Sequence, residues 1–163
     1  TALSHFSGID RRFQILGEFS YQKGHILLID DYGHHPREIA ATLKAIRNAW
    51  PDRRLVMIYQ PHRYTRTRDL FNDFVEILST VDRLLLLDVY AAGETPIPDA
   101  NSASLLKSIH QAGHLNSIHV EDKQNLSQTL AQVLQAGDVL LLQGAGDIGS
   151  IAQNLAHSQL EMN

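Results

Sequence analysis

Residues 25–39 read HILLIDDYGHHPREI, an apolar run that ends in paired aspartates and leads through a polar loop to a proline. The apolar run His25 to Ile29 is typical of a buried strand. Pro36 suits the first position of a helix, because its missing N–H would have no partner there. Apolar residues then recur at helical spacing, at Ile39, Leu43 and Ile46, and the pattern ends near Trp50 and Pro51.

The segment before this unit has the composition of a β-hairpin. Two strand-like stretches, Phe13 to Tyr21 and His25 to Ile29, flank Lys23 and Gly24. A glycine at this place can supply the positive φ of a tight turn. We therefore expect a hairpin to lead into the domain.

The alternation of strand and helix continues along the rest of the chain. Further strands are predicted over 54–60, 84–89, 117–120 and 139–143. One helix is predicted to start between Thr65 and Asp69 and to carry the stripe Leu70, Phe74, Ile77 and Leu78, with Phe71 at its margin. Others are predicted from an N-cap at Ser102 to Gly113, over 126–134 before Gly137, and over 148–160.

These strands are apolar throughout instead of alternating, which indicates burial on both faces of a sheet. We predict an α/β, Rossmann-like domain whose mostly parallel sheet is covered by helices on both faces, with an N-terminal β-hairpin. The chain has 163 residues, close to the size of a single domain, and 44% hydrophobic with 20% charged residues is an ordinary globular composition.

The composition also excludes several classes of protein. The longest aliphatic runs, 84–87 and 139–142, are far shorter than the ~20 residues that span a bilayer. The net charge of −4 argues against broad nucleic-acid binding, and the absence of cysteine excludes a disulfide framework and a thiolate metal site. We expect a cytoplasmic protein, and the start at Thr1 without a methionine suggests a fragment.

Unusual polar residues follow four of the predicted strands, in segments 30–36, 60–67, 88–94 and 143–149. In an open parallel sheet, ligands bind beyond the carboxyl ends of the strands. We therefore expect these four segments to form one site.

Arg63 and Arg66 lie three residues apart near the expected start of a helix, so they can share a face. The free N–H groups of that terminus would add attraction for an anion. One interpretation is a clamp for a carboxylate or phosphate. The alternative is a solvated helix start whose arginines pair with Asp69 or Asp73. Five basic residues are concentrated here, at positions 53, 54, 63, 66 and 68.

Two further patterns have weaker functional readings. His34, His35 and His62 near the paired aspartates could bind zinc or iron, but their spacing fits no metal motif, and hydrogen-bonding or packing roles are favoured. Residues 144–149, GAGDIG, match the dinucleotide fingerprint G-x-G-x-x-G. The sequence ends at Asn163, before the strand and acidic residue of that motif, so close backbone packing is the favoured role.

The four polar segments, DDYGHHP, QPHRYTRT, DVYAAGE and QGAGDIG, together with Arg11-Arg12-Phe13, resemble the C-terminal domain of the Mur ligases in the same order. These ATP-dependent enzymes add amino acids to the cytoplasmic peptidoglycan precursor. PHRYTR favours the branch that joins L-alanine to UDP-N-acetylmuramate over the branch that recycles a cell-wall tripeptide. Neither the UDP-sugar-binding domain nor the ATPase domain with its GxxxxGK[ST] loop is present in residues 1–163.

The resemblance implies that ATP phosphorylates the muramoyl carboxylate and that the alanine amine attacks the acyl phosphate. It implies nucleotide contacts at Arg12 and Asp31. Around L-alanine it implies Tyr32, His34, His62, Arg63 and Arg66. It assigns no catalytic residue to this chain and leaves Mg²⁺ mainly to the other domains, so the fragment alone should be inactive, without membrane or nucleic-acid partners. Two alternatives stay open: a free-standing nucleotide-binding module and a histidine-rich metallohydrolase.

Overall fold

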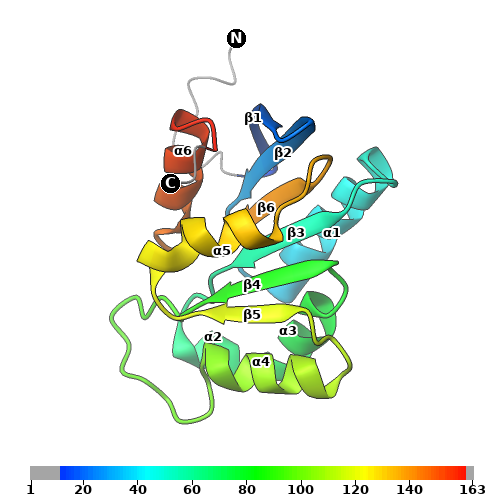
Figure 1. Ribbon diagram of the computed structural model, residues 1–163. Coiled ribbons are helices and arrows are strands. Elements are labelled where there is room, and N and C mark those ends of the chain that lie inside the picture. The colour runs from blue at the N-terminus through cyan, green and yellow to red at the C-terminus, as the bar shows by residue number, and fades with distance from the viewer. Residues whose placement is uncertain (1–11, 161–163) are drawn as a thin grey trace.

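A six-stranded sheet forms the centre of the structure, a computed structural model that describes residues 12–160 (Figure 1). The strand order is β1-β2-β6-β3-β4-β5, and β1 is antiparallel to β2 whereas the other pairs are parallel. The strands are β1 (Gln14–Tyr21), β2 (Gly24–Asp31), β3 (Leu55–Tyr59), β4 (Arg83–Leu87), β5 (Ser117–Val120) and β6 (Val139–Gln143). The predicted fold class is confirmed.

Helices cover both faces of this sheet. They are α1 (Pro36–Ala49), α2 (Tyr64–Asp69), α3 (Phe71–Leu78), α4 (Ser102–Gln111), α5 (Leu126–Val133) and α6 (Ile148–His157), with a short 3₁₀ helix, η2 (Lys123–Asn125). Leu27 and Ile29 of β2 pack in the cluster that contains α1, α3 and α4. Their neighbours Ile26 and Leu28 pack in the cluster that contains α5 and α6. The inner strands β2, β3, β4 and β6 therefore bury both of their faces, as their continuous apolar sequences predict, whereas the edge strand β1 has no buried residue.

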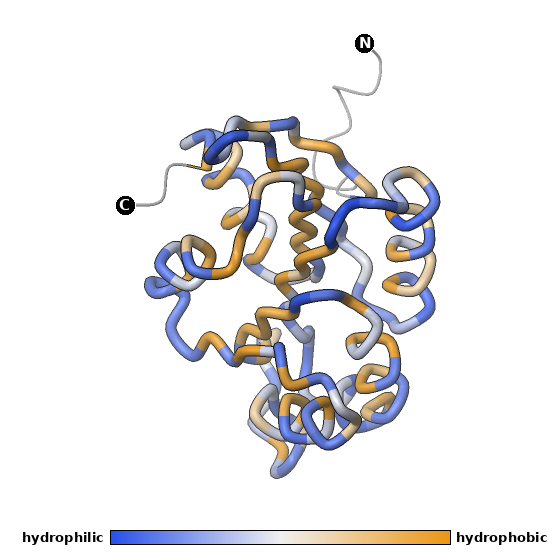
Figure 2. Tube along the Cα trace, turned by 45° about the vertical axis from the view of Figure 1, so that its right-hand side comes forward, coloured by the Kyte–Doolittle hydropathy of each residue, from blue (hydrophilic) through white to orange (hydrophobic). Residues whose placement is uncertain are grey.

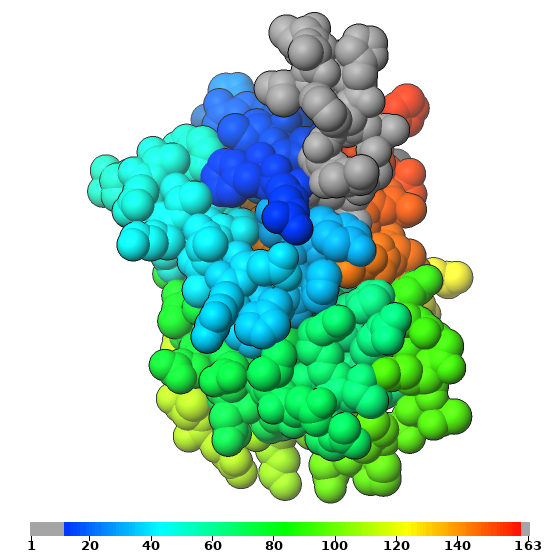
Figure 3. All heavy atoms as spheres, turned by 180° about the vertical axis from the view of Figure 1, so that it is seen from behind, coloured from blue at the N-terminus to red at the C-terminus, as the bar shows by residue number. Residues whose placement is uncertain are grey.

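The hydropathy of the chain follows this layering. The hydrophobic segments lie in the interior, and the loops are mostly hydrophilic (Figure 2). Figure 3 views the molecule from behind, where α1 (cyan) lies next to α2 and α3 (green). Within residues 12–160, no helix is long and apolar enough to cross a membrane.

The hairpin is confirmed, but its turn differs from the expectation. The positive φ, 54°, belongs to Gln22 and not to Gly24. Gly24 is needed for a different reason: a Cβ atom there would lie 3.0 Å from the Cβ of Ala136. Close approach of the start of β2 to Ala136, and not a positive φ, distinguishes this glycine.

Two predicted helices differ from the observed ones. The helix expected to run to Leu78 is two helices, α2 and α3, separated at Leu70, whose φ and ψ are −116° and 24°. The N-cap of α4 is Asn101, whose side chain accepts from the Ser104 N–H. Ser102 is the first helical residue, and its buried hydroxyl donates to the Leu87 carbonyl. Tertiary contact therefore decides between two good capping residues.

Candidate functional site

The four polar segments meet at the carboxyl ends of the parallel strands, as predicted. Gln143, the last residue of β6, donates from Nε2 to Asp31, the last residue of β2, at 2.6 Å. The Gln60 N–H donates to the Gln143 carbonyl, which joins the segment after β3 to the same edge. A parallel bridge between His62 and Tyr90 adds the segment after β4.

Asp31 is a buried carboxylate with partners from three parts of the chain. Its Oδ1 accepts from the Phe13 N–H at 2.6 Å, and its Oδ2 accepts from the Gly33 N–H at 3.0 Å and from Gln143. Gly33 has no room for a side chain, because a Cβ atom would lie 2.8 Å from Asp31 Oδ2 and from Gln143 Nε2. Asp31 therefore fixes the loop that carries the tyrosine and the two histidines.

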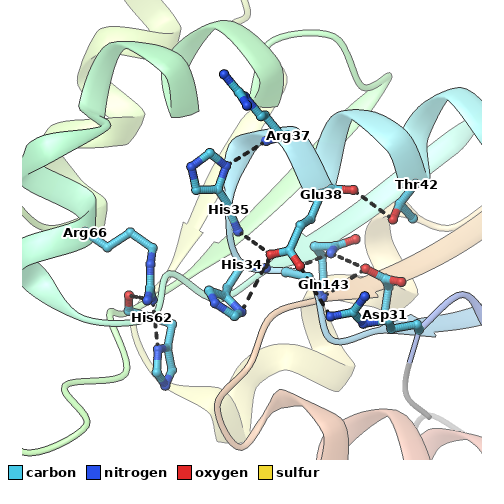
Figure 4. A network of polar contacts seen from close by, with 11 residues as sticks. Asp31, His34, His35, Arg37, Glu38, Thr42, His62, Arg66 and Gln143 are labelled. Atoms are coloured by element: carbon cyan, nitrogen blue, oxygen red, sulfur yellow. Dashed lines mark hydrogen bonds and ion pairs between the residues drawn. The ribbon is translucent and has the colours of Figure 1, made fainter. Parts of the chain in front are cut away.

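Glu38 orders the same loop from the first turn of α1. Its Oε1 accepts from the N–H groups of His34 and His35, and His35 Nδ1 accepts from the Arg37 N–H, which completes a capping box (Figure 4). Burial raises the pKa of Glu38, but the two backbone hydrogen bonds and the nearby His34 and Arg12 lower it below its ordinary value on balance. His35 thus begins the helix and is not part of a ligand set.

Four aromatic rings form a row along this edge. Tyr32 meets His34 edge-on at 5.6 Å between centroids, and His34 lies 5.8 Å from His62. His62 in turn stacks on Tyr90 at 5.6 Å, with 11° between the ring planes. The row brings together three of the residues expected around the amino acid, and it adds Tyr90, which the sequence analysis did not select.

Arg66 reaches back from α2 to His62, as Figure 4 shows. Its Nη1 lies 2.9 Å from the His62 carbonyl oxygen and 3.0 Å from His62 Nδ1. Because a guanidinium only donates, Nδ1 is the acceptor and the neutral ring carries its proton on Nε2. Burial lowers the pKa of His62, and the charges of Arg66, His34 and Arg63 lower it further, against Glu94.

Arg63 precedes α2 with a backbone φ of 73°, and its N–H donates to the Tyr90 carbonyl. The Arg63 side chain is exposed, and within residues 12–160 it has no hydrogen bond or ion pair. Neither Arg63 nor Arg66 pairs with Asp69 or Asp73; Asp69 instead pairs with Arg68. The pairs with Asp69 or Asp73 that the alternative expects are therefore absent for these two arginines.

The N–H groups at the start of α2 are not free for a ligand, contrary to the expectation. Glu94 Oε1 accepts from the N–H groups of Tyr64 and Thr65, at 2.6 and 3.0 Å, and its Oε2 accepts from the Thr65 hydroxyl. The Thr65 hydrogen bonds lower the pKa of Glu94 most. The protein therefore supplies its own anion to this helix terminus.

The basic segment does not form one patch. Arg53 and Arg54 lie at the opposite end of the sheet, where they pair with Glu18 and Asp138. Of the five basic residues, Arg66 binds His62 and Arg63 binds Tyr90 through its backbone N–H, at the edge of the site.

The glycine segment packs closely, as predicted. A Cβ atom on Gly144 would lie 2.8 Å from the Gln60 carbonyl oxygen, and one on Gly146 would lie 2.5 Å from Gln60 Oε1 and 2.7 Å from Tyr90 Cγ. Gln60 Oε1 accepts from the Ile148 N–H, and Gln60 Nε2 donates to Asp147. The first N–H group of α6 is thus bound by a side chain of the protein itself.

A separate pocket of about 370 Å³ is lined by both residues expected at the nucleotide, Arg12 and Asp31. Glu38 and Thr42 of α1 line it too, and the Arg12 guanidinium lies 3.8 Å from Glu38 Oε2. Arg11 lies outside the described residues. Within the part of the chain that the structure describes, no group of three histidine, cysteine or acidic side chains could hold a metal ion.

Residues 11–146 match the family model described as "Mur ligase, glutamate ligase domain". The chain belongs to the Mur ligase family. The UDP-N-acetylmuramate-alanine ligase of Thermotoga maritima is 26% identical with a TM-score of 0.69, and the match covers 91% of this chain and 29% of that one. A murein peptide ligase from Psychrobacter arcticus is 20% identical with the same TM-score, over 99% and 32% of the two chains.

Other matches extend across the Mur ligases and related enzymes. A domain from Haemophilus ducreyi, assigned to a UDP-N-acetylmuramate:L-alanyl-gamma-D-glutamyl-diaminopimelate ligase, is 20% identical with a TM-score of 0.62, over 91% of this chain and 99% of that one. The similarity reaches a folylpolyglutamate synthase/dihydrofolate synthase from Yersinia pestis, solved with AMPPNP and manganese at 16% identity, TM-score 0.56, over 90% and 30%. This chain thus spans about a third of the length of the full Mur ligases, and its fold alone does not separate their substrates.

The sequence analysis missed four site residues that lie inside segments it had singled out: Gln60, Tyr90, Glu94 and Gln143. It also missed Glu38, although His35 and Glu38 have the spacing of a capping box. The sequence signal for these residues was their position after a predicted strand. Such a position identifies a segment, but not the atoms that its side chains contact.

Proposed function

We propose that this chain is the C-terminal, amino-acid-binding domain of an ATP-dependent ligase that joins L-alanine to UDP-N-acetylmuramate. The observation that carries the proposal is the pair of arginines beside the aromatic row: the exposed Arg63 guanidinium has no partner among residues 12–160, and His62 holds Arg66 in place. Two guanidinium groups at a sheet edge suit a small carboxylate. The match to the alanine ligase at 26% identity supports this substrate over the tripeptide.

In the proposed reaction, the γ-phosphoryl group of ATP passes to the muramoyl carboxylate and ADP leaves. The alanine amine, as the free base, attacks the acyl phosphate; phosphate leaves and the nitrogen loses a proton. Arg63 and Arg66 would bind the alanine carboxylate, and Tyr32, His34 and His62 would limit the space around its methyl group. The phosphoryl chemistry and most of the Mg²⁺ ligands belong to domains outside this chain, so the domain alone should be inactive.

For the nucleotide we propose the pocket that Arg12 and Asp31 share. A carboxylate oxygen has two acceptor positions. Asp31 Oδ2 uses both, for Gly33 and Gln143, whereas Oδ1 binds the Phe13 N–H and keeps capacity for one ribose hydroxyl. Arg12 is 73% exposed, so it is available to phosphates.

The test is steady-state kinetics of Arg63→Ala and Arg66→Ala in the complete ligase, with L-alanine and ATP varied separately. Each lost charge-assisted hydrogen bond should raise the alanine KM about ten- to a hundredfold and leave the ATP KM unchanged. Lysine at either position should not fully restore the alanine KM, because it lacks the planar guanidinium that binds a carboxylate through two parallel hydrogen bonds. Arg68→Ala is the matched control, since Arg68 pairs with Asp69. An unchanged alanine KM in both variants would refute the clamp.

A further inference from the structure

Tyr90 links the glycine segment to the amino-acid site. Its backbone is held on both sides, because its N–H donates to the Pro61 carbonyl and its carbonyl accepts from the Arg63 N–H, both at 2.8 Å. Its ring stacks on His62. A Cβ atom on Gly146 would lie 2.7 Å from Tyr90 Cγ and 2.9 Å from Tyr90 Cβ, so any side chain at position 146 would displace the tyrosine.

The contacts continue from Tyr90 to the proposed clamp. The ring of His62 lies against Tyr90 and also contacts His34. These neighbours restrict the rotation of the imidazole, whose Nδ1 accepts from Arg66. A small displacement of Tyr90 would turn His62 and break the Nδ1 hydrogen bond to Arg66, because such bonds weaken steeply with misalignment, and the guanidinium would keep only its bond to the His62 carbonyl.

The same segment is poorly suited to phosphate. The Ile148 N–H at the start of α6 already binds Gln60 Oε1, and Gln60 and Tyr90 occupy the space above Gly146. Asp147 adds a negative charge there, which Lys123 and Gln60 bind. A dinucleotide or phosphate would have to displace all of these groups.

We infer that Gly146 and Tyr90 are positioning residues: the glycine lets the tyrosine ring lie against His62, and the stacked His62 holds Arg66 ready for the amino-acid carboxylate. This inference rests on the proposed function, and it assigns the glycine segment to the amino-acid site instead of the nucleotide site.

The first test compares Tyr90→Ala with Tyr90→Phe in the complete ligase. Tyr90→Ala should raise the alanine KM roughly three- to tenfold, the value of one aromatic pair, and leave the ATP KM unchanged. Tyr90→Phe keeps the ring and should behave as wild type. The fall of activity in acid should also move to higher pH in Tyr90→Ala, because His62 becomes less buried.

The second test is a double-mutant cycle with Gly146→Ala. Alone, this change should raise the alanine KM; in the Tyr90→Ala background it should add less, because the ring is gone and only the contacts of the new Cβ with Gln60 Oε1 and with the Cβ of residue 90 remain. Additive effects, or a raised ATP KM with an unchanged alanine KM, would overturn the inference. If Gly146→Ala does not fold, the comparison of Tyr90→Ala with Tyr90→Phe still tests the inference. Wild-type enzyme that ligates no L-alanine would refute the proposed function, whereas active wild type with an unchanged alanine KM in Tyr90→Ala would refute this inference alone.

Discussion

Asp31 shows how one side chain can serve structure and ligand together. It is buried at the end of β2, and its carboxylate joins the residue before β1, the loop after β2 and the end of β6. Such a carboxylate orders the loop whether or not a nucleotide is bound. Its loss should therefore affect folding as well as any nucleotide contact.

Asp31→Asn should lower the free energy of unfolding by about 1–3 kcal/mol, because an amide cannot satisfy all three donors. In the complete ligase it should also raise the ATP KM about tenfold or more, through a lost charge-assisted bond to the ribose. Gln143→Leu is the control: it removes one Asp31 donor and should reduce stability only. A destabilised Asp31→Asn enzyme with unaltered ATP kinetics would leave Asp31 a purely structural role.

His62 should make stability depend on pH. Its folded pKa lies below the ordinary 6.5, because of burial and then the charges of Arg66, His34 and Arg63, with Glu94 opposing. As the pH falls below 6.5, the unfolded chain binds a proton that the folded chain excludes, so stability decreases until the folded pKa is passed. Urea midpoints across this window should fall less steeply in His62→Gln than in wild type or in the exposed control His157→Gln. Parallel curves for all three proteins would contradict this.

At the scale of elements, α2 is a short helix that depends on a neighbouring loop. It has six residues and no side-chain cap of its own, and Glu94 from the loop after β4 binds its first N–H groups. Arg63 is the N-cap residue of this helix, and Arg66 lies within it. The positions of both arginines therefore depend on α2 and on the loop that carries Glu94.

Glu94→Ala should lower the thermal midpoint of the domain and raise the alanine KM of the complete ligase, because α2 loses its cap. Glu94→Gln should give a thermal midpoint and an alanine KM between those of wild type and Glu94→Ala, since glutamine keeps an acceptor oxygen but not the charge. Glu76→Ala, an exposed change on α3, provides the comparison. If Glu94→Ala matched Glu76→Ala in both measurements, the loop would not control α2.

The elements predicted well are those in which local pattern and burial agree. The strand Val139–Gln143 and the start of α1 at Pro36 are as predicted. The separation of α2 from α3 was not predictable, because the stripe of Leu70, Phe74 and Leu78 stays in register across a one-residue break. The cap by Glu94 and the stacking of Tyr90 on His62 join residues far apart in sequence, which no local pattern reveals.

At the scale of the molecule, the two ends of the sheet have different roles. The carboxyl end gathers the candidate site, and the amino end carries an ion pair that holds elements together. Arg54 binds Asp138 through both Nε and Nη2, at 3.0 and 2.7 Å, and also donates to the Val133 carbonyl. The Asp138 side chain is 2% exposed, and Arg54 is the cation that pairs with it.

Asp138→Ala should reduce the free energy of unfolding by about 3 kcal/mol, because it leaves a partly buried guanidinium without its partner. Asp69→Ala, which breaks an exposed pair with Arg68, should cost about 1 kcal/mol or less. Denaturant titrations measure both. The alanine and ATP KM values of the complete ligase should not change in either variant, and a changed KM in Asp138→Ala would show that the two ends are coupled.

The antiparallel hairpin has a consequence for how this domain is tethered. Because β1 runs against β2, it starts at Gln14 opposite Asp30, and the Phe13 N–H binds Asp31 directly. The chain that leads into Arg12 is therefore attached at the carboxyl edge of the sheet, beside the candidate site. In general, a short flexible linker keeps two joined modules at an effective concentration in the millimolar range. A displacement of the chain at Arg12 would act first on Asp31, because the N–H of the neighbouring Phe13 binds that carboxylate.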